Sequence, residues 1–312
     1  MRVIETFDAI LPEDFSAGSC VAIGKFDGLH VGHRAILQRT IESARAEGLL
    51  AVVVTFANNP LSYLRPEVCP PPLMSREQRI EGFAEAGVDV CVMVEFDASV
   101  ASIPAERFVS DVLVDRLRAR RIVMGAGFRF GHRGAGDGEL LHELGERYGF
   151  ASEVLELVGE GDPAGMVSSS RIREAAMSGD VEAAARMLGR PLGVRGTVVH
   201  GDARGREIGF PTANLGGEIE GLVPADGVYA GWVVQNGGKR VAAISVGANV
   251  TFDPEGESRV EAFVLDFDRD IYGERIEVRF ARRLRGMERF ESLEALISQM
   301  GADVDATREL LA

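Results

Sequence analysis

The sequence offers little support for disulfides, membrane spans or a basic surface. Its 312 residues include only three cysteines, which are scattered and odd in number, so reduced thiols in a cytoplasmic protein are expected. No apolar stretch reaches membrane-spanning length, and the N-terminus lacks the apolar core of a signal peptide. The net charge of -14 argues against a nucleic-acid or anionic-membrane partner, since those need clustered Lys and Arg. The sequence does not determine whether the protein is a monomer or a homo-oligomer.

The first half of the chain alternates apolar runs with helical patterns. Strands are predicted over residues 50–56, 88–94 and 121–124, and helices over residues 34–46, 75–86, 105–118 and 138–148. Such alternation predicts a Rossmann-like α/β domain, in which crossover helices connect the strands of a parallel sheet. Cys20 and Cys91 lie in apolar runs, where they should pack as small hydrophobic residues.

The second half of the chain has the two-residue period of β-strands. Two short helices, over residues 170–178 and 181–188, come first, and Gly189-Arg190-Pro191 then interrupts the chain. Short strands are predicted over residues 196–200, 227–234, 240–246, 260–266 and 275–280, with a closing helix over 292–311. This spacing predicts a small antiparallel barrel. We therefore expect two domains, 1–188 and 189–312.

A motif rich in glycine and histidine follows the apolar run 20–23. Residues 24–33 read GKFDGLHVGH, and a helical pattern follows them. A strand that leads through glycines into a helix directs backbone N–H groups and the positive helix end at one volume, which suits a phosphate. His30 and His33 can donate to phosphoryl oxygens, and no further His or Glu follows at zinc-site spacing. A phosphate is therefore favoured over a metal, and the candidate residues are Gly24, Phe26, Asp27, Gly28, His30 and His33.

A second candidate site lies in residues 201–214, which read GDARGREIGFPTAN. Glycines with nearby arginines suit a loop that covers phosphates. Thr212 and Asn214 are two residues apart, so their side chains face the same way on an extended segment. Their oxygens suit Mg2+ that is also held by nucleotide phosphates. On composition alone, a polar turn explains the segment equally well.

The first motif resembles the H-x-G-H signature of the nucleotidyltransferase superfamily. The resemblance implies that His30 and His33 stabilise the triphosphate of ATP in the transition state and that no side chain becomes attached to the nucleotide. Residues 168–173, SSSRIR, are similar to an S-S-T-R-I-R segment of flavin-adenylylating relatives. A serine cluster at a helix start is ordinarily an N-cap. The resemblance adds a clamp on the ATP phosphates, formed by Ser169, Ser170, Arg171 and Arg173.

The second motif resembles the P-T-A-N motif of riboflavin kinases. Residues 260–273, VEAFVLDFDRDIYG, are similar to a downstream stretch of the same family. The resemblance implies that Thr212 and Asn214 coordinate Mg2+ with ATP, and that Glu261 takes the proton of the ribityl 5'-hydroxyl. Without it, Glu261 would be read as an outward-facing strand carboxylate. The implied ATP site comprises Gly205, Gly209, Pro211, Thr212 and Asn214.

The two motifs together resemble the bifunctional bacterial riboflavin kinase/FAD synthetase family. The resemblance implies a nucleotidyltransferase domain followed by a six-stranded antiparallel barrel with a terminal helix. It also implies that riboflavin and ATP give FMN and ADP, and that FMN and ATP then give FAD and pyrophosphate. Two alternatives stay open, a monofunctional riboflavin kinase with a weakened transferase domain and a flavin-binding regulatory protein. The second is disfavoured because binding alone needs no base.

Three segments depart from the patterns of that family. Residues 125–131, GAGFRFG, carry Gly127 where Asp or Asn is usual, and the implied flavin-side residues are Phe56, Gly127 and Phe128. Residues 55–60, TFANNP, carry Asn58 and Asn59 where Pro and His are common. Residues 245–249, SVGAN, differ from N-I-G-T-R. The first two departures support the monofunctional alternative.

Overall fold

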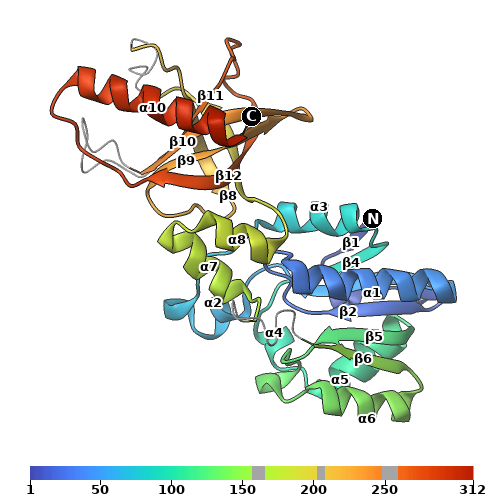
Figure 1. The fold of residues 1–312 in the computed structure, drawn as a ribbon. Helices are drawn as coiled ribbons and strands as arrows, with labels where there is room; N and C mark the ends of the chain where they lie inside the picture. Colours follow the sequence, from blue (N-terminus) through green and yellow to red (C-terminus); the bar gives the residue numbers. More distant parts are fainter. Residues whose placement is uncertain (157–165, 202–207, 248–258, 312) are drawn as a thin grey trace. The chain divides into compact units, whose positions relative to one another are not determined.

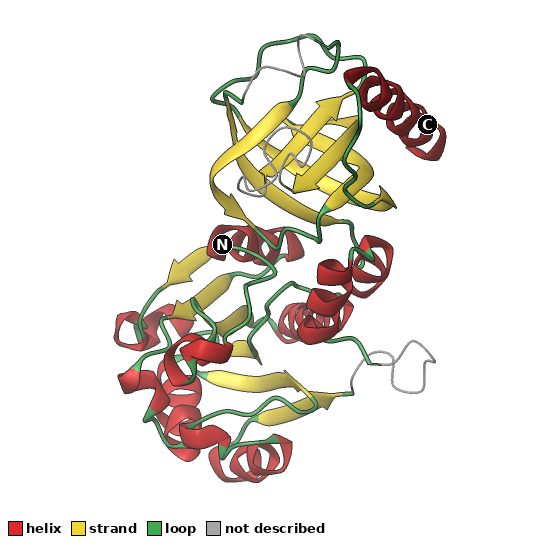
Figure 2. Cartoon of the chain, turned by 90° about the vertical axis from the view of Figure 1, so that its left-hand side faces the viewer, coloured by secondary structure: helices red, strands yellow, loops and turns green. Residues whose placement is uncertain are grey.

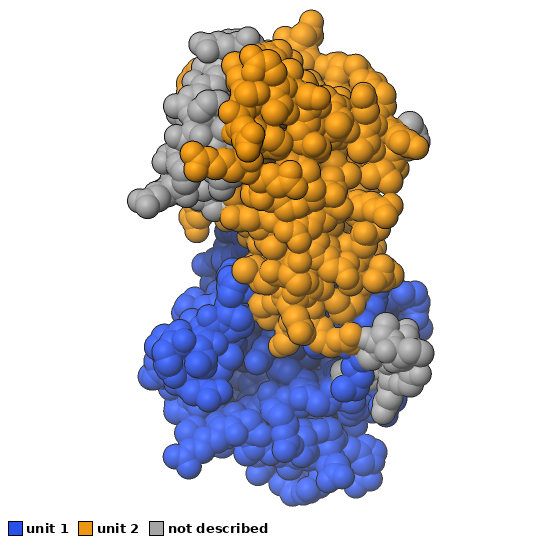
Figure 3. All heavy atoms as spheres, turned by 60° about the vertical axis from the view of Figure 1, so that its left-hand side comes forward, with its two compact units in different colours: residues 1–168 blue, residues 169–312 orange. Residues whose placement is uncertain are grey.

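The structure is a computed structural model that describes residues 1–156, 166–201, 208–247 and 259–311. It divides into two compact units, residues 1–168 and 169–312 (Figure 3). Each unit is described by itself below. Within the described ranges, no helix combines the length and the apolar character needed to cross a bilayer.

The first unit is built on a six-stranded parallel sheet (Figure 1). Its strands are β1 (Arg2–Ile4), β2 (Ser19–Ile23), β3 (Leu50–Phe56), β4 (Val90–Val94), β5 (Ala119–Gly125) and β6 (Ala151–Leu155). The strand order is β1-β4-β3-β2-β5-β6, and every pairing is parallel, as the alternation of strands and helices predicted. The chain runs outward from β2 to β3 and later returns to β5 on the other side. The carboxyl end of β2 is therefore the switch point at which such sheets bind ligands.

Helices pack on both faces of this sheet (Figure 2). The helices of this unit are α1 (Val31–Glu47), α2 (Pro60–Leu64), α3 (Arg76–Ala86), α4 (Ala98–Ala101), α5 (Ala105–Arg107), the π-helix η4 (Phe108–Arg116) and α6 (Gly138–Tyr148). Single 3-10 turns lie at η1 (Phe7–Ala9), η2 (Pro12–Phe15), η3 (Pro66–Val68) and η5 (His132–Gly134). Cys20 and Cys91 are free, fully buried and packed in the core beneath α1 and α3, which confirms their predicted role as small hydrophobic residues.

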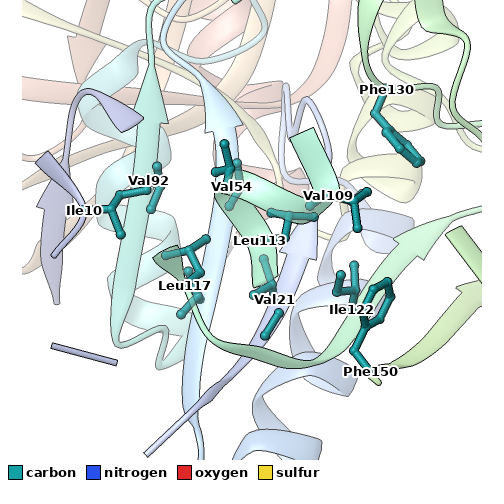
Figure 4. Packing of buried hydrophobic residues seen from close by; sticks show 14 of the residues in the cluster. Ile10, Val21, Val54, Val92, Val109, Leu113, Leu117, Ile122, Phe130 and Phe150 are labelled. Atoms are coloured by element: carbon teal, nitrogen blue, oxygen red, sulfur yellow. The ribbon is translucent and has the colours of Figure 1, made fainter. Parts of the chain in front are cut away.

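The helix predicted over residues 105–118 is not a single α-helix. Only α5 is α-helical, and η4 continues it with the wider π-helical hydrogen bonding, as in the bond from the Leu117 N–H to the Val112 carbonyl. Val109, Leu113 and Leu117 lie against the sheet in the core shown in Figure 4. Apolar residues spaced by three and four positions fit both kinds of helix, so the pattern alone could not distinguish them.

The second unit begins with two short helices, α7 (Ser169–Ser178) and α8 (Val181–Leu188). Gly189 ends α8 in the left-handed conformation, with φ 68°, and α8 packs against β7 and β12. The sequence-based division at residue 188 falls at this break and stays a prediction. The closed barrel has the order β10-β11-β8-β7-β12-β9. Its strands are β7 (Leu192–Val199), β8 (Ala213–Glu220), β9 (Gly227–Gln235), β10 (Gly238–Gly247), β11 (Arg259–Val264) and β12 (Arg275–Arg285).

The last helix, α10 (Leu293–Leu311), packs on β9 and β10. A bidentate ion pair between Arg285 and Asp303 attaches it to the barrel, with Nη2 to Oδ2 at 2.8 Å and Nε to Oδ1 at 3.0 Å. Both side chains are largely buried. The closed antiparallel barrel and its terminal helix confirm the expected fold of this half.

Candidate active sites

The glycine-histidine motif forms the loop between β2 and α1. His30 is the N-cap of α1, and its Nδ1 accepts the backbone N–H of His33 at 3.3 Å. Because Nδ1 accepts this bond, the proton of a neutral His30 ring lies on Nε2. The ring is almost wholly buried. His30 therefore caps the start of α1 and holds an N–H donor in a fixed tautomer.

The rings of His30 and His33 stack on each other. Their centroids are 3.6 Å apart and the ring planes are inclined by 17°. Phe26 meets the His33 ring edge-on at 5.2 Å. Burial, followed by the neighbouring His30, lowers the pKa of His33 well below 6.5, so its ring is neutral near pH 7. Its Nδ1 is buried with no hydrogen-bond partner in the described structure, which is the kind of atom that a ligand satisfies.

The loop that carries these histidines has an unusual backbone. Phe26 and Leu29 have φ of 50° and 45°, a left-handed region that non-glycine residues seldom occupy, and Gly28 has φ 90°. The Asp27 carboxylate accepts the Leu73 N–H at 3.0 Å. Gly24 directly follows β2, and its N–H donates to the Val54 carbonyl at 3.3 Å. The left-handed backbone of Phe26 and Leu29 costs energy and persists only where surrounding contacts hold it. Residues of this kind are concentrated at ligand sites.

The flavin-side candidates lie at the same edge of the sheet. Phe56 ends β3, and Gly127 and Phe128 follow β5, and these two strands flank β2. Phe56 and Phe128 pack on one core, and Phe56 meets Phe96 edge-on at 5.1 Å. Parallel strands bring their carboxyl ends together, so the structure gathers these residues and the histidine loop at one edge.

The two asparagines that depart from the family pattern each have a structural role. Asn58 pairs with the backbone of Phe96, accepting its N–H at 2.8 Å and donating to its carbonyl at 3.2 Å. Asn59 is the N-cap of α2 and accepts the Leu61 N–H at 3.1 Å. Hydrogen bonds therefore order the loop at the position where proline would restrict it.

The serine-arginine segment lies at the start of α7, in the second unit. Ser169, Ser170, Arg171 and Arg173 occupy the first turns of this helix, and Ile172 between them is buried. His30 and His33 belong to the first unit. The clamp on ATP phosphates that was expected of this segment stays a prediction.

The riboflavin-kinase motif and Glu261 come together on the barrel. The Thr212 hydroxyl donates to the Glu261 carboxylate at 3.1 Å, and the Asn214 amide donates to the Thr212 hydroxyl at 3.2 Å. Asn214 stands opposite Glu261 in the pairing of β8 with β11, so their side chains share one face of the sheet. Asn214 is buried, whereas Thr212 and Glu261 are half-buried. Three oxygen-bearing side chains thus form one polar cluster, as their predicted shared role requires.

Ser245 belongs to the same row of side chains. It stands opposite Glu261 on β10, and its hydroxyl donates to the Met287 sulfur at 3.9 Å. In the sequence, Ser245 is notable only because it departs from a family pattern. The strand register shows that it lies beside the proposed base.

Two candidates for the ATP site, Gly209 with φ 90° and Pro211, precede β8. Gly205 lies outside the described residues, as does part of the segment 245–249.

Comparison with known proteins identifies both halves. The FAD synthetase family model matches residues 13–171, and the riboflavin kinase family model matches residues 188–311. The bifunctional riboflavin kinase/FMN adenylyltransferase of Escherichia coli (strain K12) is 36% identical over 295 residues, covering 94% of this chain and 92% of the relative. The chain belongs to this family. The protein of the same name from Pseudomonas fluorescens is 36% identical over 315 residues, covering 100% of this chain and 98% of that one.

A solved structure supports the fold of this bifunctional enzyme along its length. The crystal structure titled "Macrolide-efflux Protein from Streptococcus pneumoniae" has a TM-score of 0.84 at 34% sequence identity, and the match covers 99% of each chain. The expectation of two activities is confirmed by the family membership and by the presence of both enzyme domains. It is favoured over a monofunctional kinase or a regulatory protein.

Proposed function

We propose that the barrel forms FMN from riboflavin and ATP, with Glu261 as the base that takes the proton of the ribityl 5'-hydroxyl. A hydroxyl nucleophile needs positioning and proton removal as its bond to phosphorus forms. The observation that carries this assignment is the hydrogen bond from Thr212 to Glu261. It fixes one carboxylate oxygen of Glu261 within the polar cluster.

Thr212 and Asn214 are proposed to hold Mg2+ together with the ATP phosphates. They fit a hard cation, because the Thr212 hydroxyl lies beside the Glu261 carboxylate and the Asn214 side chain, which also carries an oxygen, is hydrogen-bonded to that hydroxyl. The described residues contain no group of three or more His, Cys, Asp or Glu that could hold a metal. The cation would neutralise phosphate charge, while the protein's residues orient it and the substrate. Gly205, Gly209 and Pro211 complete the proposed ATP site.

The parallel-sheet unit is proposed to join FMN to the AMP part of a second ATP, releasing pyrophosphate. His30 and His33 would stabilise the charge that builds up on the phosphates, with Gly24, Phe26, Asp27 and Gly28 shaping the site. The FMN phosphate is ionised near neutral pH, so the attacking group needs no protein base. Phe56, Gly127 and Phe128 would contact the flavin.

A cytoplasmic location is proposed from the thiols. Burial raises the pKa of Cys20 and of Cys91 to about 12, which keeps both as neutral thiols. Cys69 is a third free cysteine. This cysteine usage suits a reducing compartment.

One assay tests the assignment of the two reactions. The protein is incubated with riboflavin, ATP and Mg2+, and in parallel with FMN, ATP and Mg2+, and the flavins are separated by chromatography. FAD in both incubations is the expected result. FMN alone in the first and no FAD in the second would mean that the sheet unit is inactive, and unchanged riboflavin would remove the kinase assignment.

Substitution of the proposed metal residues should raise the Mg2+ requirement of the kinase step. Thr212→Val and Asn214→Leu each remove one oxygen while roughly keeping side-chain volume. The Mg2+ concentration at half-maximal FMN formation should therefore increase in both variants. FAD formation from supplied FMN provides the control and should keep its Mg2+ dependence. An unchanged requirement in both variants would leave the segment as a turn.

Gly127 offers a test of the missing flavin contact. Its φ is +82°, which Asn tolerates better than most residues, and a Cβ there would meet no atom within 4 Å. Gly127→Asn should lower the KM for FMN about two- to tenfold, the worth of one net hydrogen bond. Gly127→Ala is the matched control, because it adds the same Cβ without the amide. Equal KM values for the two variants would contradict a flavin contact at this position.

A further inference from the structure

Helix α3 presents three residues to the transferase site from one face. Arg79, Gly82 and Phe83 are spaced by three and four positions, which places them together on a helix. Arg79 is only 6% exposed, and Phe83 is fully buried. Arginine is seldom buried this deeply without a charged partner, so its contacts require an explanation.

Arg79 is bound to the end of β3. Its Nη1 donates to the Phe56 carbonyl at 2.8 Å, and its Nη2 donates to the Ala57 carbonyl. These are the residues at which the chain leaves the sheet beside the histidine loop. Among the described residues Arg79 forms no ion pair, and burial lowers the pKa of its guanidinium although the charge of Asp27 opposes that shift. Two neighbouring carbonyls thus take the place that a carboxylate usually takes.

The same face of α3 supports the histidine loop. Leu29 lies so close to Gly82 that a Cβ there would be 2.4 Å from the leucine Cδ1. Phe83 meets Phe26 edge-on at 5.7 Å. Leu29 and Phe26 are the two non-glycine residues of that loop with left-handed backbones. One helix therefore contacts both the loop that carries the histidines and the strand end that carries Phe56.

We propose that Arg79 is a positioning residue for FMN in the adenylylation reaction. Its planar fork holds two successive carbonyls at the end of β3 and so fixes the direction of the Phe56 side chain relative to the histidine loop. Lysine cannot reproduce this geometry, because its ammonium group donates all of its hydrogen bonds from one nitrogen and not from a planar fork. The inference rests on the proposed assignment of Phe56 to the flavin.

The test is a comparison of Arg79→Lys with Arg76→Lys in the full-length protein. Arg76 lies on the same helix, but its guanidinium is bound at the surface by Glu5 and Glu77. Arg79→Lys should raise the KM for FMN in FAD formation about tenfold, the cost of one charged hydrogen bond, with kcat within about threefold. Arg76→Lys should leave both unchanged. FMN formation from riboflavin should be the same in all three proteins.

Gly82→Ala provides a second variant with a different expected signature. The added methyl displaces Leu29 and with it His30, so kcat for FAD formation should fall while the KM for FMN stays within about twofold. Thermal unfolding is measured for each variant. If Arg79→Lys lowers kcat and stability together, as a general packing defect would, or leaves the KM for FMN unchanged, the proposal is overturned.

Phe56→Leu separates failure of this inference from failure of the site assignment. A raised KM for FMN in Phe56→Leu with a normal KM in Arg79→Lys would keep Phe56 in the flavin site and refute the role of Arg79. The reverse result would remove Phe56 from the flavin site and would overturn the proposal that Arg79 acts by fixing Phe56.

Discussion

Glu261→Gln is expected to reduce FMN formation by about 10^2 to 10^4, the usual cost of losing a general base. Glutamine keeps the size of the side chain and an oxygen that can accept the Thr212 hydroxyl, 3.1 Å away in the parent protein. It cannot take the proton of the ribityl hydroxyl. FAD formation from supplied FMN should stay within a few-fold of the parent rate, because Glu261 belongs to the barrel. The measurement is the initial rate of each reaction, with the flavins separated by chromatography.

Glu218→Gln is the matched control for this variant. Glu218 is exposed on β8, which neighbours β11, the strand that carries Glu261. The same chemical change is therefore made outside the polar cluster. Its kinase rate should equal that of the parent. An equal loss of both activities in Glu261→Gln would contradict the assignment of the base or the separation of the two reactions.

The core strands could be predicted from the sequence because they are buried on both faces. The segment predicted over residues 50–56 is β3 with the same bounds, since an unbroken apolar run has little alternative. Strand β8 gives no such signal. It contains Gly216 and Gly217 and is buried only over its first three residues, so its composition indicates a loop. The sixth barrel strand was expected only from the family resemblance.

The kinase cluster shows what the sequence leaves undetermined. Spacing alone placed Thr212 and Asn214 on one face, which the hydrogen bond between them confirms. Glu261 lies 49 positions from Thr212, and only the register of β11 on β8 brings it to that face. A one-residue slip would turn its side chain to the other face of the sheet. Its role could therefore be inferred from resemblance but not from the local pattern.

Arg79 illustrates a second limit of sequence reasoning. On a helix that starts with charged residues, an arginine is ordinarily a solvated one, and nothing near position 79 indicates burial. Its partners are the carbonyls of Phe56 and Ala57, more than twenty positions earlier in the chain. Backbone carbonyls are present at every residue, so no side-chain pattern marks those that a distant guanidinium will bind.

Replacement of His30 is expected to have the largest effect on FAD formation. His30→Ala removes the Nε2 donor and also the helix cap to the His33 N–H. Loss of one preorganised donor to developing charge costs about 10^2 to 10^3 in kcat. FMN formation from riboflavin should be unchanged in the same protein. The loss of the cap should lower the stability of the first unit by about 1 kcal/mol, measured by denaturant unfolding.

His30→Asn separates the catalytic effect from the capping effect. Asparagine is among the best N-cap residues, so it should restore the bond to the His33 N–H and most of the lost stability. It cannot present an imidazole N–H at the position of Nε2, and its shorter side chain leaves the His33 ring without its stacking partner at 3.6 Å. FAD formation should therefore stay as low as in His30→Ala although the helix is capped again. If the rate returned with the stability, His30 would only start the helix, and the charge on the phosphates would have to be stabilised by His33 and the backbone N–H groups at the start of α1.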